Sequence, residues 1–320
     1  MFAKHIARSL AVAACFFALS ACDDKNADKP QEPPISAEQA EVVKYNAYVE
    51  AANMASSSFG NDLAQYEKYI KPVFDGKKPM KDLFFSEPGA MDRIQQQLDK
   101  ARAMKPAMAE LDEPARMYSE ALAKAGPVSR DLYNYIGAKT YKSDNGDHGR
   151  EVQPAYLTNM QSLVVAQADF LNGIDAKDRA RIKAEFEKTK KDTLEYYRMG
   201  SIYYLKESMD AAGDFINGEG LGNKKDAFKT ALNQLNSMLT AYDAKMREHN
   251  KVGCSNLLFT ANAYLSKGRD AIERTENGEY EKEAKEPKQF RLMESQQTQD
   301  AKSLLQNYNN MISAINMGKC

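Results

Sequence analysis

The stretch Ser36–Ile70 reads SAEQAEVVKYNAYVEAANMASSSFGNDLAQYEKYI, and its pattern decides the fold class. One seam of positions recurs in steps of three and four, at Val42, Tyr45, Val49, Ala52, Ser56, Phe59, Leu63, Tyr66 and Ile70. This spacing places mostly apolar side chains along one side of a helix. Ser36 and Gln39 fit a capping box, in which each side chain bonds to the other residue's backbone. We therefore expect one long helix over residues 36–70, bent near Gly60.

Similar seams run along most of the remaining chain. They predict helices over residues 91–104, 111–136, 156–173, 176–216, 228–246, 258–272 and 301–315. Gly126-Pro127 lies inside the second of these and should kink it. No stretch alternates with a period of two for long, so no sheet is expected. The predicted fold class is all-α, a bundle of about seven long helices packed at shallow angles.

Three segments lack an apolar face. Residues 71–89 are rich in proline and glycine and predict a loop, with one turn around Lys81–Phe85. Residues 142–149 form the clearest loop in the middle of the chain. The stretch from Gly278 to Lys288 is charged, and the run from Glu276 to Glu286 predicts a solvated, partly disordered face.

The first residues have the organisation of a bacterial export signal. Lys4 and Arg8 precede an apolar run, residues 9–18, that is too short to span a bilayer. The run ends in Leu19-Ser20-Ala21-Cys22, which resembles the lipobox of bacterial lipoproteins, where the cysteine becomes the lipidated N-terminus. The expected divisions are a signal peptide (1–21), lipidated Cys22 with a flexible tether (22–35) and a helical domain (36–320). The alternative is a secreted protein with a chance cysteine at position 22.

Lipidation would make a membrane the first partner of the chain, because two or more acyl chains anchor a protein stably. The charged, proline-rich residues 23–35 would reach at most ~45 Å when extended. In lipoproteins of enteric-type bacteria, an Asp after the lipidated cysteine signals retention in the inner membrane. By that resemblance, Asp23 predicts the periplasmic side of the inner membrane rather than the outer membrane.

Composition and motifs argue against several classes of function. The formal net charge is −1 and no basic stripe stands out, so a nucleic-acid partner is not expected. The chain has three histidines and neither a Gly-x-Ser-x-Gly elbow nor a His-Glu-x-x-His motif. The loop after Asp144 fails the register of an EF-hand, because Gly146 takes the third position and Ala155 the twelfth. We therefore expect no enzyme, no cofactor and no metal site.

Two of the four cysteines remain available for a disulfide bond. Cys15 leaves with the signal peptide and Cys22 carries lipid, which leaves Cys254 and Cys320 in a compartment where disulfides persist. If helices over 254–275 and 296–317 form an antiparallel hairpin, both cysteines lie at the same end of it. This predicts a Cys254–Cys320 disulfide. The alternative is that Cys254 is a small buried residue and Cys320 a loose end.

The 17 tyrosines supply a candidate binding surface. The pairs Tyr196-Tyr197 and Tyr203-Tyr204 lie two turns apart on one predicted helix. A groove lined by these rings would suit a peptide, a glycan or a small ligand, because each ring has an apolar face and a polar tip. The alternative is that the tyrosines pack the helices together.

Several short segments carry a family resemblance. They are Cys22-Asp23-Asp24-Lys25, Lys44-Tyr45-Asn46, the region Tyr133–Tyr141 with Lys142 and Asp144, and the helix with Tyr196-Tyr197 and Lys206. In these the chain resembles the YiiG-like family of bacterial lipoproteins, a domain family of unknown function. Where such relatives read Lys-Asp-Asp, this chain has Lys142-Ser143-Asp144. The resemblance implies an all-α fold and supplies no reaction.

Two hypotheses for the function follow from these observations. The first is an anchored interaction module that presents a helical surface to another envelope protein or an envelope polymer. The alternative is a small-ligand-binding protein with a tyrosine-lined pocket between helices. A large exposed apolar stripe would favour the first and a tyrosine-lined pocket the second.

Overall fold

The computed structural model describes residues 36–55, 58–81, 83–250, 252–285 and 294–318. Within these ranges the secondary structure is helical and contains no strand, which confirms the all-α prediction. The described residues form eight helices of 14 residues or more: α1 (Ala37–Asn53), α4 (Ala90–Ala103), α5 (Ala109–Gly137), α6 (Asp147–Lys188), α7 (Leu194–Ala211), α9 (Lys225–Asn250), α10 (Ser255–Glu276) and α12 (Gln296–Asn316). None of the described helices has both the length and the apolar character needed to cross a membrane.

The described helices fall into two compact units, and the division lies between Ala176 and Lys177, inside α6. We call residues 36–176 the amino-terminal unit and residues 177–318 the carboxy-terminal unit. The predicted signal peptide and the tether with Cys22 and Asp23 lie outside the described residues.

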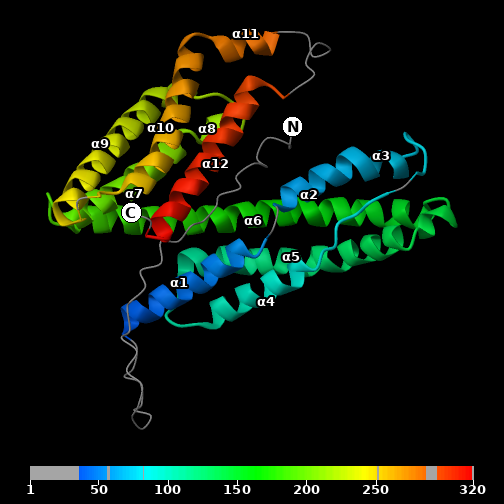
Figure 1. Cartoon of the computed structure of the whole chain (residues 1–320). Helices are drawn as coiled ribbons and strands as arrows, with labels where there is room; N and C mark the ends of the chain where they lie inside the picture. Colours follow the sequence, from blue (N-terminus) through cyan, green and yellow to red (C-terminus); the bar gives the residue numbers. More distant parts are fainter. Residues whose placement is uncertain (1–35, 56–57, 82, 251, 286–293, 319–320) are drawn as a thin grey trace. The chain divides into compact units, whose positions relative to one another are not determined.

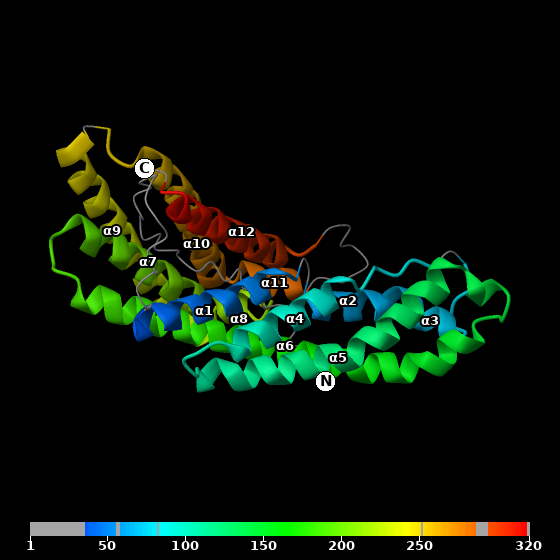
Figure 2. The same cartoon turned by 90° about the horizontal axis from the view of Figure 1, so that it is seen from below.

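The amino-terminal unit contains α1, α4, α5 and the first part of α6. It also contains α2 (Phe59–Gln65), a π-helical turn η2 (Tyr66–Ile70) and α3 (Lys71–Phe74), which follow one another directly. Helices α5 and α6 meet at the turn around residues 138–146 and run in opposite directions (Figure 2). The core between the helices is large and rich in aromatic rings, with Tyr48, Phe59, Tyr118, Leu122 and Phe170 all buried.

The single helix expected over residues 36–70 is wrong in its middle. The capping box at Ser36 and Gln39 is present, but α1 ends at Asn53 and α2 starts at Phe59. The side chain of Ser58 accepts a hydrogen bond from the backbone of Asn61 and so caps a new helix. The apolar spacing continues across this interruption, which is why the pattern alone does not reveal it.

The boundary expected between residues 173 and 176 is also wrong, because α6 continues through it to Lys188. A Cβ atom on Gly173 would lie 3.1 Å from Cδ2 of Leu111, so the glycine allows close packing against α5 instead of ending the helix. The break comes later, where Asp192 adopts a positive φ of 61° and the side chain of Thr193 caps α7.

The carboxy-terminal unit is built from α7, α9, α10 and α12. Short helices α8 (Gly213–Ile216) and α11 (Glu279–Lys285) and a 3-10 turn η4 (Gly222–Lys224) connect them. Figure 1 shows α10 rising to α11 and α12 returning beside α10, as the hairpin prediction requires. The solvated face predicted for the charged run after Gly278 is wrong at Tyr280. This residue of α11 is buried, and its hydroxyl donates a hydrogen bond of 2.8 Å to Asp300.

Candidate functional site: an aromatic cavity in the amino-terminal unit

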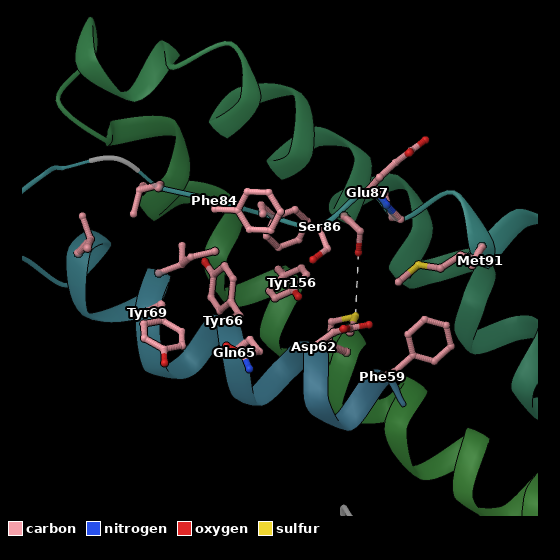
Figure 3. A pocket seen from close by; sticks show the side chains of 18 of the residues that line it. Phe59, Asp62, Gln65, Tyr66, Tyr69, Phe84, Ser86, Glu87, Met91 and Tyr156 are labelled. Carbon is pink, nitrogen blue, oxygen red and sulfur yellow. Dashed lines mark hydrogen bonds between the residues drawn. The ribbon is translucent and has the colours of Figure 1, made fainter. Parts of the chain in front are cut away.

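A cavity of about 870 Å³ lies in the amino-terminal unit, beside α2, η2 and α3 (Figure 3). Residues 78–81 and 83–88, which we call the strap, form its second wall. Met91 of α4, Ser129 of α5 and Tyr156 and Met160 of α6 also line it. The cavity therefore lies where several separate stretches of the chain meet.

Local sequence explains how these walls form. Asp62, Tyr66 and Tyr69 are spaced by four and three residues, so they lie on one helical face. Pro79 and Pro88 lie at the two ends of the strap, and its described residues 83–88 form no helix; the turn expected around Lys81–Phe85 is absent from the described part of this segment.

Ring packing and hydrogen bonds attach the strap to the helices. The ring of Phe85 packs edge-on against Tyr66 and Tyr156, with centroids 6.2 Å and 5.6 Å apart. The backbone N–H of Leu83 donates to the hydroxyl of Tyr141 at 3.4 Å. Phe85 and Leu83 thus attach one end of the strap beside the cavity, and at the other end Nζ of Lys78 donates to the carbonyl oxygen of Lys68 at 3.5 Å.

The cavity is apolar inside and carries aromatic rings and charges at its mouth. Its lining includes the buried side chains Phe59, Ile70, Val73, Met91 and Met160. Tyr69 is 51% exposed and Phe84 is 81% exposed, and both rings border the opening. Charged side chains of both signs also line it, namely Asp62, Lys78, Lys81 and Glu87.

The two buried tyrosines of the cavity differ in their hydrogen bonding. The Tyr66 hydroxyl donates to Oε1 of Gln153 at 3.2 Å, and Nε2 of Gln153 donates to Asp75 at 2.9 Å. The Tyr156 side chain is only 1% exposed, and within the described part of the chain no hydrogen bond engages its hydroxyl. Burial raises the pKa of both phenols above the usual value, so both are neutral at physiological pH.

Asp75 fixes the hydrogen-bond chain that ends at Tyr66. Hydrogen bonds from Lys71 and Gln153, with a further one from Lys77, lower the pKa of Asp75 to about 2. An ionised Asp75 can only accept, so the Gln153 amide must turn its NH₂ toward it and its oxygen toward Tyr66. This arrangement commits the Tyr66 hydroxyl as a donor, so that of the two buried tyrosines Tyr156 is the one with an unused hydroxyl.

The four tyrosines predicted to line a groove lie in the carboxy-terminal unit. Tyr196, Tyr203 and Tyr204 surround Phe186, with ring centroids 5.0, 5.4 and 5.9 Å from it. Tyr197 donates to Asp192 at 3.0 Å. All four tyrosines are partly buried, and Tyr197 joins the same aromatic cluster through Tyr196, at 5.5 Å between centroids. This arrangement fits the packing alternative, and a ligand groove at these residues stays a prediction.

Cys254 is buried and is a disulfide-bonded cysteine in the structure. Its backbone N–H donates to Asp243 at 2.6 Å, just before α10 begins. Leu257 near the start of α10 and Ile315 near the end of α12 line one small cavity, so these two helix ends lie close together. Cys320 lies outside the described residues, and its pairing with Cys254 stays a prediction.

The loop at Asp144 is occupied by its own hydrogen bonds. The Asp144 carboxylate accepts from the Tyr135 hydroxyl at 2.6 Å and from the backbone of Gly146 and His148 at 3.0 and 3.2 Å. It therefore closes the turn ahead of α6. In the described ranges, no group of three or more His, Cys, Asp or Glu side chains is placed to hold a metal ion.

Two lysines that carry the sequence resemblance form buried ion pairs. Lys44 of α1 lies 2.7 Å from Asp112, and Lys206 of α7 lies 2.5 Å from Asp178. Both lysine side chains are almost wholly buried, which makes each pair a constraint on how its helices pack.

These features define the chain as an all-helical protein with a ligand-sized aromatic cavity. The chain belongs to the DUF3829 family, a protein family of unknown function whose model matches residues 39–317. No curated protein and no solved structure matches the chain.

The sequence pattern does not single out the cavity residues. The available signal is the density of aromatic residues around a proline-rich loop, at Tyr66, Tyr69, Phe84 and Phe85. Exposed aromatic side chains in a segment without helical periodicity indicate a binding surface more specifically than tyrosines inside a helical seam.

Proposed function

We propose that this protein is a lipid-anchored envelope protein that binds a small apolar ligand in the aromatic cavity. The observation that carries the proposal is the cavity itself, bordered by the exposed rings of Tyr69 and Phe84. Its size falls within the range of about 300–1,000 Å³ typical of small-molecule sites. An apolar interior with a few polar groups is also the usual composition of such sites.

The distribution of exposed apolar side chains favours ligand binding over an interaction module. Most exposed large apolar side chains of the described residues are spread over different helices, for example Val43, Met117 and Phe259. Tyr69 and Phe84 are different, because both line the mouth of one cavity. No reaction is proposed.

The membrane anchor is the second part of the proposal. The lipobox ending in Cys22 and the likeness to YiiG-like lipoproteins support it, and Asp23 favours the periplasmic face of the inner membrane. Changing Cys22→Ala should abolish lipidation, so that the protein is either released or left unprocessed. If the variant is still cleaved before residue 22 and remains with membranes after a carbonate wash as the parent does, the anchor is refuted.

Ligand binding can be tested with prodan, a naphthyl ketone whose fluorescence reports its surroundings. The protein is the unlipidated mature chain carrying Cys22→Ala. We expect saturable prodan binding, and we expect Ser86→Trp to weaken it at least tenfold, because Ser86 is an exposed strap residue that lines the cavity. Ser237→Trp, at an exposed position on α9, is the matched control and should bind as the parent does. Absence of saturable binding, or equal affinity of the Ser86→Trp variant, would refute the proposal.

A further inference from the structure

We infer that the Tyr156 hydroxyl is the polar anchor of the cavity, and that the ligand is a neutral compound whose apolar body carries a carbonyl or hydroxyl oxygen. This inference rests on the proposed ligand-binding function and adds the chemical class of the ligand.

The Tyr156 hydroxyl has unused hydrogen-bonding capacity at the cavity. The side chain is 1% exposed and lines the cavity, and no hydrogen bond within the described residues satisfies its hydroxyl. The oxygen of this hydroxyl is not among the buried polar atoms that lack a partner in the described residues, so it reaches the open space of the cavity. A ligand oxygen that accepts from this hydroxyl would make a hydrogen bond that the described protein groups do not supply.

Tyr66 provides an internal comparison in the same cavity. Its ring lies 4.4 Å from the ring of Tyr156, but its hydroxyl is committed to Gln153 at 3.2 Å. Only one of the two neighbouring phenols therefore has a donor left for a ligand. The chemistry of the cavity is thus asymmetric, and Tyr156 is its specificity-determining residue.

The ring of Tyr156 is held in place on two sides. Tyr66 and Phe85 contact it with centroid distances of 4.4 Å and 5.6 Å. A fixed ring fixes the direction of its hydroxyl, so a ligand loses no freedom of the protein side chain on binding. The rest of the ligand would lie against Phe59, Met91 and Met160, which are buried and apolar and which suit an aromatic or aliphatic body.

The charges around the cavity favour a neutral ligand. Figure 3 shows the side chains of Tyr66, Tyr156 and Asp62 gathered in the cavity, and the charge of Asp62 acts on Tyr156. A ligand carboxylate near Tyr156 would be repelled by this negative charge. Over the whole lining, Lys78 and Lys81 are balanced by Glu87 and Asp62, so no single sign of charge is selected.

The test compares Tyr156→Phe with Tyr66→Phe, because each removes one hydroxyl and keeps its ring. Bound prodan should emit at a longer wavelength in the parent than in Tyr156→Phe, since its carbonyl loses a hydrogen bond in the variant. The affinity of Tyr156→Phe should fall about 3- to 10-fold, which corresponds to one hydrogen bond. Tyr66→Phe removes a hydroxyl that already donates to Gln153, so its change in emission should be smaller than that of Tyr156→Phe. Unchanged affinity and emission in Tyr156→Phe would overturn the inference, whereas absence of prodan binding by the parent would refute the proposed function instead.

A competition experiment on the parent protein tests the ligand class without a variant. Three naphthalene derivatives are compared as competitors of bound prodan. They are acetonaphthone, which is a neutral ketone, naphthoate, which is a carboxylate, and ethylnaphthalene, which is a hydrocarbon. The ketone should displace prodan at the lowest concentration. Equal or better displacement by naphthoate or by ethylnaphthalene would overturn the assignment of a neutral oxygen-bearing ligand.

Discussion

Lys44 and Asp112 form an ion pair inside the amino-terminal unit, with Nζ of Lys44 2.7 Å from Oδ1 of Asp112. Lys44 also donates to the carbonyl oxygen of Met104 at 3.0 Å. Asp112 accepts from the backbone of Met108 at 2.8 Å and from the Tyr48 hydroxyl. Because these residues come from α1 and from the start of α5, the pair joins two helices that are distant in the sequence.

The two partners of this pair should not be equivalent on mutation. Asp112→Ala leaves the fully buried ammonium of Lys44 without its carboxylate and should cost about 3–5 kcal/mol. Lys44→Met leaves Asp112 partly exposed and still hydrogen-bonded, so it should cost about 1–3 kcal/mol. Urea unfolding followed by circular dichroism measures both. Arg116→Ala, which breaks exposed ion pairs on α5, is the control and should change stability little. Equal effects of Asp112→Ala and Arg116→Ala on stability would contradict the claim that Asp112 neutralises a buried charge.

Acid should weaken the hydrogen bonds that Asp75 accepts from Lys71, Lys77 and Gln153 beside the cavity. The pKa of Asp75 is about 2 in the folded protein and about 4 in an unfolded chain. Because the folded value is the lower one, the ionised carboxylate stabilises the fold above pH 4, and this contribution is lost as the pH falls toward 2. The free energy of unfolding should therefore depend less steeply on pH between about 4 and about 2 in Asp75→Asn than in the parent. Parallel curves for the two proteins would show that Asp75 contributes nothing.

The predicted Cys254–Cys320 disulfide can be tested by intact mass after alkylation. In mature chain carrying Cys22→Ala, these are the two remaining cysteines. We expect no alkylation without reductant and two alkylated thiols after reduction. Reduction should also lower the free energy of unfolding by roughly 2–4 kcal/mol, because the bridge closes a long loop. Two alkylated thiols in the unreduced protein would refute the pairing.

The helical periodicity of the sequence predicts the fold class but not every boundary. Residues Ala90–Ala103, Ala109–Gly137 and Gln296–Asn316 form helices close to the predicted ranges, because their apolar faces pack against neighbours with the same period. Gly173 is read as a helix end, yet its missing Cβ allows Leu111 to approach. A glycine that ends a helix and one that permits close packing look the same in a sequence, and only the neighbouring helix distinguishes them.

The candidate site is less accessible to sequence reasoning than the fold. The strap has no periodic pattern, so nothing local predicts that Phe85 packs on Tyr156, some seventy residues further along the chain. Tyrosine pairs such as Tyr203-Tyr204 are conspicuous in the sequence, but in the structure they surround Phe186. Which rings enclose a cavity and which fill a core depends on long-range packing.

Two phenylalanines with the same exposure provide a matched comparison for the mouth of the cavity. Phe84 on the strap is 81% exposed and Phe259 on α10 is 80% exposed. Neither substitution by alanine should destabilise the protein much, because both rings are largely in solvent. Phe84→Ala should weaken prodan binding about 3- to 10-fold through the loss of a ring contact with the ligand. Phe259→Ala should bind as the parent does, and equal affinities of the two variants would exclude Phe84 from the site.

The most direct test of the ligand cavity uses methyl-labelled methionine. Met91 and Met160 line the cavity, whereas Met238 packs near Gly200 in the carboxy-terminal unit. In an NMR titration of the parent protein with prodan, assigned through Met→Leu variants, the methyl signals of Met91 and Met160 should shift and saturate together. The Met238 signal should stay in place. Saturating shifts at Met238 with none at Met91 or Met160, or no shift at any of the three, would contradict the claim that this cavity binds a ligand.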